Sequence, residues 1–351
     1  MKNILKHEVL AALREYALDM IPDENLVTLP SFSNHVWKVK SKNQIYVLRR
    51  YSKIPYEDLV CMNSNIVTLI NLGIPIPHFI RNLDGAYATC ISEHGYDLSE
   101  FIPHVELKYP DMNITNKQIK QAAALLAKIH NIPFTQLPYP IPDKSANELN
   151  FNYTLKLIDE FQSIFQKLLI SATQDEKVKL YNLYELIKLT DDNRREFIDK
   201  EAFSLEHCPK VLSQGDFSLS NLLPASLDKK MYIVDWENMG LRTRAWELHR
   251  SLLLICGKGY CNANFDELDF KRATIFLNFY KSQVDLSFEE ISLLPRIAEY
   301  IAFFHWTRFT LESVLREDNR ILERIPHKIE EGLWWKTNSK IYTNWIQKYL
   351  E

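Results

Sequence analysis

Two aspartates and an asparagine in the segment 211–248 have types and spacing that could do chemistry. Asp216 follows Gly215, Asn221 lies five residues later, and Asp235 ends a run of β-branched and aromatic residues. Transfer of a phosphoryl group needs a carboxylate that orients or deprotonates the attacking hydroxyl, and oxygen ligands for magnesium beside the phosphates. Asp216 has the position of the base, while Asn221 and Asp235 offer the hard oxygen ligands that suit Mg²⁺. These residues could instead shape a turn and cap a helix, but their combined spacing favours phosphoryl transfer.

The first part of the chain, residues 1–94, carries mainly strand patterns. Residues 4–18 have helical spacing, and residues 35–51 alternate as two strands joined by a short polar link, which is typical of a hairpin. Pro75 and Pro77 stop the helical pattern that precedes them. We therefore expect helices at 4–18 and 56–72. Strands are expected at 26–29, 35–40, 44–51 and 87–92, with the strands before the second helix antiparallel.

The second part, residues 95–351, is mostly helical in pattern. A helix that can be capped by Thr115 or Asn116 runs to His130, and residues 150–205 are charged and predict an inserted helical hairpin. Short strands are expected at 210–213 and 231–234, on either side of the Asp216 loop. After Trp246 the chain is predicted to be helical almost to its end.

The composition excludes several classes of protein. The 351 residues are 46% apolar and 25% charged, and 42 basic against 45 acidic residues give a net charge of −3. The sequence lacks the excess of basic residues that is typical of proteins that bind nucleic acid or a membrane surface. Eight glycines exclude a loop with several glycines around a phosphate. Five cysteines without a CxxC pair predict reduced thiols, and the absence of a signal peptide or an 18-residue apolar run predicts a cytoplasmic protein without membrane or nucleic-acid partners.

The segment VLSQGDFSLSNLLPASLDKKMYIVDWENMGLRTRAWEL (211–248) resembles the aminoglycoside phosphotransferase and choline kinase-like family. It is similar to that family's His-Gly-Asp-x4-Asn catalytic loop and Asp-Trp-Glu metal segment, and the interval to Trp-Glu-Leu resembles bacterial choline kinases, with spore-coat kinase-like proteins as further relatives. The resemblance implies an α+β, protein kinase-like bilobal fold, with a nucleotide-clamping lobe at 1–94 and a catalytic, acceptor-binding lobe at 95–351. It implies ATP and Mg²⁺, with Asp216 as the base and Asn221, Asp235 and Glu237 as metal ligands.

Segments of the N-terminal part extend this resemblance. SFSNHVWKV (31–39) is similar to the hairpin that covers the phosphates, YVLRRY (46–51) to the strand with the phosphate-binding cation, and ISEHGYDL (91–98) to the hinge. LLAKIH (125–130) matches the end of a large-lobe helix, where His130 is interpreted as a packed residue. The resemblance thereby places seven residues at the nucleotide: Ser31, Ser33, Asn34, Arg49, Ser92, Glu93 and His94.

Three positions depart from the family pattern. Gln214 replaces the histidine of the catalytic loop, and it can still donate and accept hydrogen bonds. Ser31 stands where a glycine would let the backbone approach phosphate. The helix 56–72 has Met-Asn-Ser-Asn at 62–65, where a glutamate would pair with the cation of the strand. Arg49 is therefore expected to pair with Glu57 or with a group that the sequence does not identify.

The acceptor is expected to be a small-molecule hydroxyl. The resemblance places acceptor contacts after Glu237 and in the C-terminal helices, where Trp246, Glu247, Trp306 and Trp334 lie. Aromatic faces with carboxylates suit an amine, as in choline or an aminoglycoside, although the same aromatics could be helix-packing core. Sugars, other amino alcohols and protein hydroxyls stay open, as does a pseudokinase or scaffold that keeps only the fold. The sequence does not indicate the oligomeric state.

Overall fold

The computed structural model describes most of the chain and divides it into two units. The described residues are 3–18, 25–31, 34–41, 44–105, 107, 114–144, 151–199, 208–226, 229–258, 267–315, 322–323 and 325–349. The first unit comprises residues 1–107, 134–141 and 220–238, and the second comprises 108–133, 142–219 and 239–351. The predicted lobe boundary between residues 94 and 95 stays a prediction.

The first unit is built on a five-stranded sheet in which all neighbouring strands are antiparallel. Its strands follow the order β1-β2-β3-β5-β4. The predicted hairpin is confirmed by the pairing of the second and third strands. The strands are β1 (Leu26–Leu29), β2 (His35–Ser41), β3 (Gln44–Tyr51), β4 (Thr89–Ile91) and β5 (His94–Glu100).

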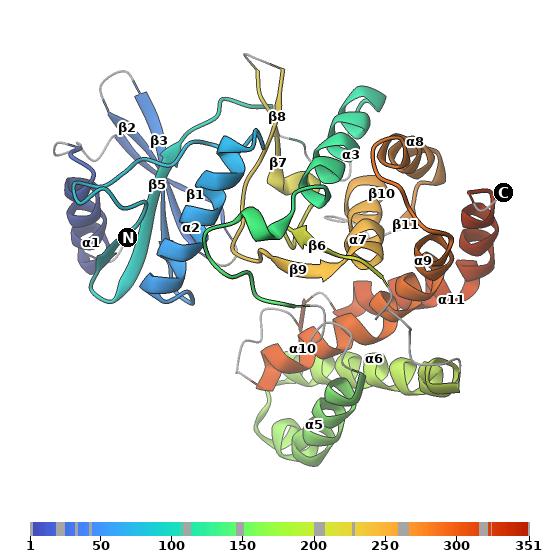
Figure 1. Ribbon diagram of the computed structural model, residues 1–351. Coiled ribbons are helices and arrows are strands. Elements are labelled where there is room, and N and C mark those ends of the chain that lie inside the picture. The colour runs from blue at the N-terminus through green and yellow to red at the C-terminus, as the bar shows by residue number, and fades with distance from the viewer. Residues whose placement is uncertain are drawn as a thin grey trace. The chain divides into compact units, whose positions relative to one another are not determined.

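Two helices lie on opposite faces of this sheet (Figure 1). Helix α1 (Asn3–Glu15) buries its apolar side against a cluster that includes Leu48, and α2 (Tyr56–Asn71) packs against Tyr51. Since side chains alternate along a strand, Arg49 shares the α2 face with Tyr51, whereas Arg50 shares the α1 face with Leu48. Gly95 permits the close approach of α2, because a Cβ atom there would lie 2.6 Å from Cδ2 of Leu59.

The first unit also contains a short β-hairpin. Strand β7 (Leu222–Pro224) pairs antiparallel with β8 (Met231–Ile233). The backbone N–H of Ile233 donates to the carbonyl of Pro75 at 2.9 Å, and the N–H of Val234 donates to the carbonyl of Asn221 at 3.0 Å. Because the strands run in opposite directions, the residue before β7 and the residues after β8 come to the same end of the hairpin.

The second unit is predominantly helical, as the sequence predicts. A small antiparallel pair, β6 (Lys210–Ser213) with β9 (Gly240–Thr243), leads into α7. The helix α3 begins with a capping box in which the Thr115 hydroxyl accepts the N–H of Gln118. The other elements are η2 (Phe134–Gln136, in the first unit), α3 (Asn116–His130), η4 (Leu219–Asn221, mostly in the first unit), α7 (Arg244–Cys256), β10 (Gly257–Lys258), β11 (Glu267–Leu268), α8 (Phe270–Lys281), α9 (Phe288–Tyr300), the π-helical η5 (Ile301–His305), α10 (Trp306–Leu315) and α11 (Ile325–Gln347).

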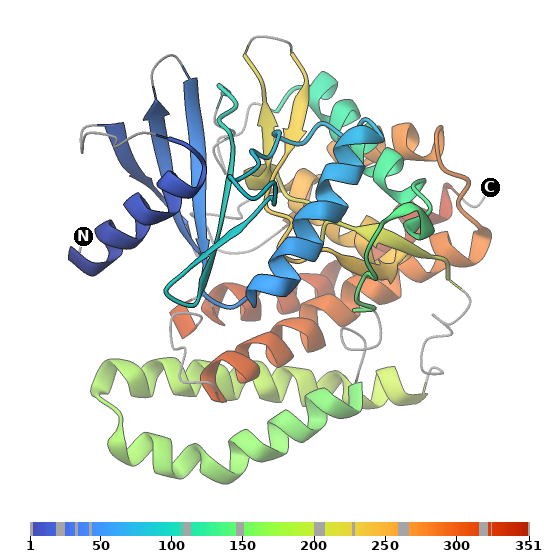
Figure 2. The ribbon, with the colours of Figure 1, turned by 60° about the vertical axis from the view of Figure 1, so that its left-hand side comes forward.

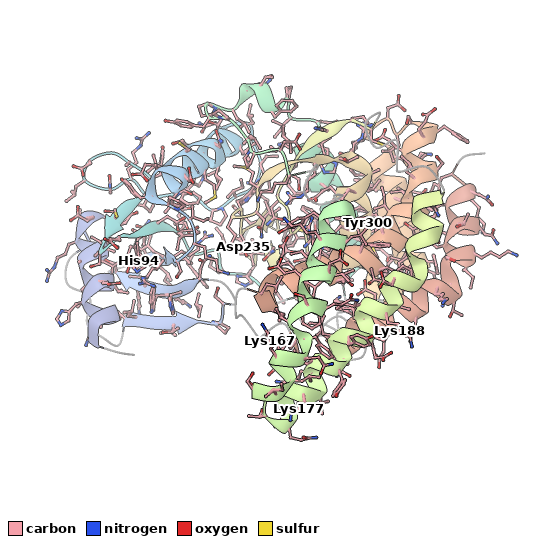
Figure 3. The ribbon with its side chains drawn as sticks, turned by 90° about the horizontal axis from the view of Figure 1, so that it is seen from below. His94, Lys167, Lys177, Lys188, Asp235 and Tyr300 are labelled. Carbon is pink, nitrogen blue, oxygen red and sulfur yellow. The ribbon has the colours of Figure 1, made fainter. Side chains whose placement is uncertain are left out.

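The predicted helical hairpin is present in the second unit. Helices α5 (Phe151–Ser171) and α6 (Gln174–Asp199) run side by side (Figure 2), and Lys167 and Lys177 lie near the end where they are joined (Figure 3). Buried side chains such as Phe161 and Leu183 pack with Leu311 of α10. Among the described residues, no helix is both long and apolar enough to cross a membrane. The expected mixed fold, β-rich at the N-terminal end and helical at the C-terminal end, is confirmed.

Candidate active site

A cavity of about 220 Å³ lies within the first unit. Its lining combines an apolar wall with a small number of polar groups, which is the usual make-up of a small-molecule site. The apolar residues are Leu29, Pro30, Val36, Val47, Pro77, Phe101, Ile102, Leu223 and Val234. The polar residues are Ser31, Asn34, Arg49, Ser99, Glu100, His104, Asn221 and Asp235.

The β7–β8 hairpin brings two of the predicted metal ligands into this cavity. Asn221 immediately precedes β7 and Asp235 follows β8 by one residue, and both line the cavity. Asp235 has a left-handed backbone, with φ of +61°. A non-glycine residue in this region is strained and is found disproportionately at functional sites. The backbone conformation of Asp235 is therefore consistent with a functional role for this residue.

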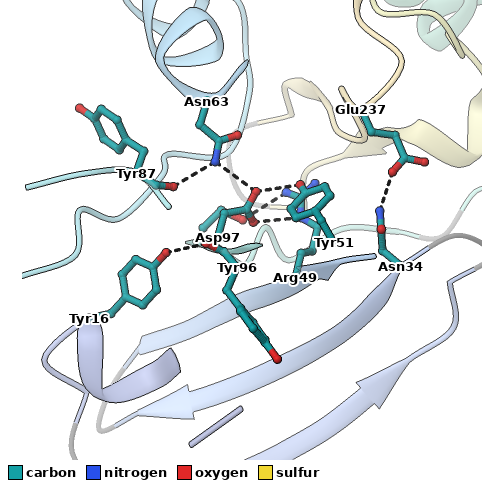
Figure 4. A network of polar contacts seen from close by, with 10 residues as sticks. Tyr16, Asn34, Arg49, Tyr51, Asn63, Tyr87, Tyr96, Asp97 and Glu237 are labelled. Carbon is teal, nitrogen blue, oxygen red and sulfur yellow. Dashed lines mark hydrogen bonds and ion pairs between the residues drawn. The ribbon is translucent and has the colours of Figure 1, made fainter. Parts of the chain in front are cut away.

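Arg49 lines the same cavity, but its partner is not the one suggested by the sequence. Its Nε lies 3.5 Å from Oδ1 of Asp97, the residue directly opposite on β5 (Figure 4). Its Nη2 donates to the Ser99 hydroxyl at 3.5 Å. Glu57, by contrast, lies exposed on the first turn of α2. Glu57 is therefore not the partner, and the group that the sequence left unidentified is Asp97, because cross-strand register brings Asp97 to the guanidinium.

Several anionic groups surround Arg49. Burial opposes the charge of this side chain, but its pKa still rises above the ordinary value, because the oxygen of Tyr51 and the carboxylate of Asp97 lie beside it. The carboxylates of Asp235 and Glu237 act in the same direction. Arg49, the predicted phosphate-binding cation, and two predicted metal ligands thus share one electrostatic environment inside the first unit.

Asp97 is itself held by a network of neutral donors. Its carboxylate is fully buried, and Oδ2 accepts the Tyr51 hydroxyl at 2.8 Å and Nδ2 of Asn63 at 3.4 Å (Figure 4). Asn63 also donates to the carbonyl of Tyr87 at 3.0 Å. Burial raises the pKa of Asp97, and the charge of Arg49, ahead of the two hydrogen bonds, opposes that rise.

The loop between β1 and β2 reaches the metal segment. Nδ2 of Asn34 donates to Oε2 of Glu237 at 2.6 Å (Figure 4), and the backbone N–H of Asn34 donates to the Ser31 hydroxyl at 3.4 Å. Asn34 and Ser31 both line the cavity, whereas Ser33 lies outside the described residues. Glu237 is therefore joined by a direct hydrogen bond to the loop between β1 and β2, which is predicted to cover the phosphates.

Three of the residues that the resemblance places at the nucleotide lie where β4 turns into β5. Ser92 and Glu93 form the two-residue turn between β4 and β5, with φ of +47° and +69°, and His94 starts β5. These three residues are not part of the cavity lining, which instead takes residues 99–102 from the far end of β5. Because β5 continues for six residues beyond His94, these three residues lie at the opposite end of the strand from the cavity, and their assignment to the nucleotide stays a prediction.

The proposed base, Asp216, lies in the second unit on a loop that three side chains support. Its backbone N–H donates to Oε1 of Gln214 at 2.8 Å, and Nη2 of Arg250 lies 3.4 Å from its Oδ1. Glu247 is buried and accepts the backbone N–H of Gly215 at 3.4 Å. Gln214 thus braces the loop as the family histidine is expected to do, and Glu247 contacts the loop backbone from α7. About a third of the Asp216 side chain is exposed.

The predicted acceptor residues of the second unit fall into two aromatic groups. The Trp246 ring meets the His305 ring edge to face at 5.3 Å, and His305 in turn meets Trp306 at 5.2 Å. Trp334 instead packs edge to face on Trp335 at 4.8 Å. Trp246 is buried, while Trp306 and Trp334 are half-buried. The structure therefore connects Trp246 with Trp306, through the π-helical turn that ends at His305.

A cation already lies on one of these rings. Nζ of Lys328 is 3.9 Å from the Trp306 ring centroid and 2.7 Å from Oε2 of Glu331. Burial, ahead of the nearby cations Arg250 and Arg308, holds the pKa of His305 well below its usual value. The region around η5 is accordingly one where charged groups meet aromatic faces.

His130 has the packing role that the sequence predicts. It is buried at the end of α3, its Nδ1 lies 2.6 Å from the Tyr280 hydroxyl, and its ring meets the Tyr280 ring edge to face. Burial, followed by the charge of Arg244, lowers the pKa of His130 to about 3. A neutral, hydrogen-bonded imidazole in the core is consistent with a structural residue.

Sequence reasoning missed Asp97, Arg250 and Lys328. For Asp97 a signal existed, because it stands between Tyr96 and Leu98 in a strand and must face the opposite side from those two buried residues. The polar run at 62–65 inside an otherwise apolar helix was a second signal, since Asn63 is its hydrogen-bond donor. Arg250 and Lys328 carry no comparable signal, because each is one charge among many on a helical pattern.

Comparison with known proteins agrees with this geometry. A model of the phosphotransferase enzyme family matches residues 26–268, which is most of the chain. No curated protein matches the chain. The motif resemblance and the prediction of a phosphotransferase are both confirmed by the family match.

Solved structures share the fold at low sequence identity. A spectinomycin phosphotransferase in complex with ADP and spectinomycin is 15% identical, with 97% of this chain and 98% of that chain covered at a TM-score of 0.58. An amicoumacin kinase bound to AMP-PNP, Ca²⁺ and its ligand is 13% identical, with 93% and 96% covered at 0.59. A choline/ethanolamine kinase family protein from Mesorhizobium loti is 14% identical, with 100% and 99% covered at 0.57. At these identities the likeness concerns the fold.

Proposed function

Because the chain belongs to the phosphotransferase enzyme family, we propose that it transfers the γ-phosphoryl group of ATP to a hydroxyl of a small molecule. The observation that carries the proposal is the composition of one cavity. A cation, Arg49, and two oxygen ligands, Asn221 and Asp235, line it together with an apolar wall. These are the groups that a nucleoside triphosphate and its metal ion require.

In this proposal ATP occupies the cavity of the first unit. Apolar side chains such as Val36, Val47 and Phe101 receive the adenine ring. Arg49 pairs with phosphate oxygens, because a guanidinium offers paired donors to such groups. The solved relatives with bound ADP and AMP-PNP support a nucleotide in this fold.

The donor set also fits a divalent cation, which we propose to be Mg²⁺. Asn221 and Asp235 would hold it, with Glu237 as a third oxygen ligand; Mg²⁺ is usually held by one or two carboxylates together with phosphate oxygens. Within the described ranges no group of three or more His, Cys, Asp or Glu side chains could hold a metal by itself, so phosphate oxygens would complete the shell. When bound, the ion neutralises charge on the phosphates.

Asp216 is proposed as the base that receives the acceptor proton. The hydroxyl oxygen forms a bond to the γ-phosphorus, the bond from that phosphorus to the ADP oxygen breaks, and the hydroxyl proton passes to the Asp216 carboxylate. Gln214 and Glu247 hold the backbone of this loop. Only four residues separate Asp216 from Asn221 along the chain.

We propose an amino alcohol or an aminoglycoside as the acceptor. Trp306 and Trp334 are half-buried in the second unit, and an aromatic face can bind an amine by a cation–π contact. One face of Trp306 is occupied by the Lys328 ammonium at 3.9 Å, so an acceptor amine would use another aromatic face. The relatives named for spectinomycin and for choline/ethanolamine kinases are consistent with this class. A cytoplasmic location is part of the proposal, since the four described cysteines are all free of disulfides.

A screen of ATP consumption over alcohols and amino alcohols tests the function. We expect turnover with at least one amino alcohol, and Asp216→Asn should reduce it by roughly 10²–10⁴-fold while nucleotide still binds in the presence of Mg²⁺. Asp269→Asn serves as the matched control, because Asp269 caps α8 of the same unit and pairs with Arg272. Asparagine caps a helix about as well as aspartate, so both turnover and melting temperature should stay close to those of the wild type. Wild-type turnover by Asp216→Asn refutes the base assignment, and nucleotide binding without turnover of any acceptor would favour a pseudokinase.

A further inference from the structure

We propose that Asp97 is the positioning residue for Arg49, and that a carboxylate within the sheet takes the place of the missing glutamate on α2. The inference rests on the proposed function, because it concerns the cation that meets the phosphates of the nucleotide. It assigns a role to a residue in the middle of β5, which lies in the segment 91–98 but is not one of the residues that the resemblance places at the nucleotide.

The register of the sheet supplies the first argument. Arg49 and Asp97 are direct partners on β3 and β5, and Nε of Arg49 lies 3.5 Å from Oδ1 of Asp97. In the described part of the chain neither of these two atoms has a hydrogen-bond partner, so each faces mainly the other. Nη2 of Arg49 reaches Ser99, the next residue on the same face of β5. The guanidinium is thereby held along β5, at the edge of the cavity that Ser99 also lines.

The second argument is that Asp97 cannot easily move. The Tyr51 hydroxyl and Nδ2 of Asn63 both donate to Oδ2, so Oδ1 is turned toward Arg49. The carboxylate is fully buried, whereas the Arg49 side chain keeps 15% of its surface exposed. A fixed, buried anion beside a partly exposed cation orients the cation and leaves its outer nitrogens available to the cavity.

The third argument comes from Asn63 on α2. Its amide lies 3.4 Å from Oδ2 of Asp97 and also binds the Tyr87 carbonyl. A glutamate at this point would place a second anion against the buried Asp97 carboxylate, which costs free energy because like charges in a buried site repel each other. An uncharged residue at position 63 is therefore needed when the carboxylate is Asp97 of the sheet. The orientation of Arg49 then depends on the register between β3 and β5.

Asp97→Asn tests this role, with nucleotide affinity as the main readout. The Kd of ADP with Mg²⁺ is measured by titration calorimetry on the full chain, beside the melting temperature and the ATP KM. We expect Kd and KM to rise roughly tenfold, the usual effect of losing a residue that orients a binding group. Glu8→Gln is the matched control: Oε2 of Glu8 lies 3.3 Å from Nε of Arg50, the neighbouring residue on the opposite face. It removes a similar ion pair and should leave Kd unchanged.

A double-mutant cycle shows whether Asp97 acts through Arg49. In an Arg49→Met background, Asp97→Asn should change Kd by less than about twofold, because the group to be oriented is gone. Equal effects of Asp97→Asn with and without Arg49 overturn the proposal, as does an unchanged Kd in folded Asp97→Asn protein.

Tyr51→Phe covers the case in which Asp97→Asn does not fold. It keeps both charges and removes only the hydroxyl on Oδ2, so Kd should rise about 2- to 10-fold, and an unchanged Kd again overturns the proposal. Failure of the wild-type protein to bind ADP or ATP with Mg²⁺ is a separate result, which refutes the proposed function and this inference with it.

Discussion

Replacing Gln214 with leucine tests the support of the catalytic loop. Gln214 is 1% exposed, and its Oε1 accepts the backbone N–H of Asp216 at 2.8 Å. Leucine has a similar size but offers no acceptor, so the change removes the hydrogen bond without opening a large cavity. The geometry of the loop around the proposed base should therefore loosen.

The expected magnitude follows from the energetics of hydrogen bonds. An intramolecular hydrogen bond contributes about 0.5–1.5 kcal/mol net, and a donor left without a partner costs about 1–3 kcal/mol. If that cost falls on the productive conformation of the loop, kcat decreases by roughly 5- to 150-fold, since about 1.4 kcal/mol corresponds to a factor of ten. The nucleotide Kd should stay unchanged, because Arg49, Asn221 and Asp235 belong to the first unit.

The assay measures kcat at saturating ATP, the ADP Kd and the melting temperature for each variant. Gln214→His should retain most of the activity, because an imidazole nitrogen can accept the same N–H. Thr190→Val is the matched control, since the buried Thr190 hydroxyl bonds to Thr307 between α6 and α10, and its loss should affect stability alone. A folded Gln214→Leu enzyme with wild-type kcat would refute the reasoning.

Three further predictions follow from the described geometry. Arg49→Ala should raise the ATP KM much more than Arg50→Ala, because only Arg49 lines the cavity while Arg50 pairs with Glu8; steady-state kinetics that give the reverse order would contradict the assignment. Trp306→Ala should raise the acceptor KM about 2- to 30-fold, the loss of one cation–aromatic contact, with the ADP Kd unchanged, whereas a lower melting temperature with constant KM would make the ring a packing residue. Burial lowers the pKa of His130 to about 3 in the folded protein, whereas a histidine in the unfolded chain has a pKa of about 6.5. As the pH falls below about 6.5, His130 is therefore protonated in the unfolded chain and not in the folded protein. Unfolding free energy should then decrease on acidification by up to about 1.4 kcal/mol per pH unit for this residue, and urea titrations at pH 7 and pH 5 should show a smaller decrease in His130→Gln.

Local patterns were sufficient for much of the fold. The alternating residues of 35–51 predicted the β2–β3 hairpin, because side chains that point to opposite faces of a sheet leave a two-residue period in the sequence. The strand expected at 210–213 coincides with β6, in which residues 211–213 are all buried. The same holds for the α5–α6 hairpin. The spacing of Asp216, Asn221 and Asp235 was enough to indicate phosphoryl transfer, since few other functions require these residue types together.

Contacts between distant segments were beyond the reach of local patterns. The extent of β5 depended on its pairing with β3, which continues to Glu100, well beyond the residues 92–94, and this register is not visible in those residues themselves. Glu247 was predicted as an acceptor contact. In the structure it is buried on α7 and accepts the backbone N–H of Gly215, a contact between residues 32 positions apart.

The sequence by itself therefore determined the type of chemistry and the elements that carry it, through residue identity, spacing and periodicity. Only the tertiary structure decided which carboxylate orients Arg49. Asp97 lies 48 residues away along the chain and is brought opposite by the pairing of β3 with β5. The physical reason is that an ion pair depends on distance in space and on burial, and both follow from strand register and from the neutral donors Tyr51 and Asn63 that leave one oxygen of Asp97 to the arginine.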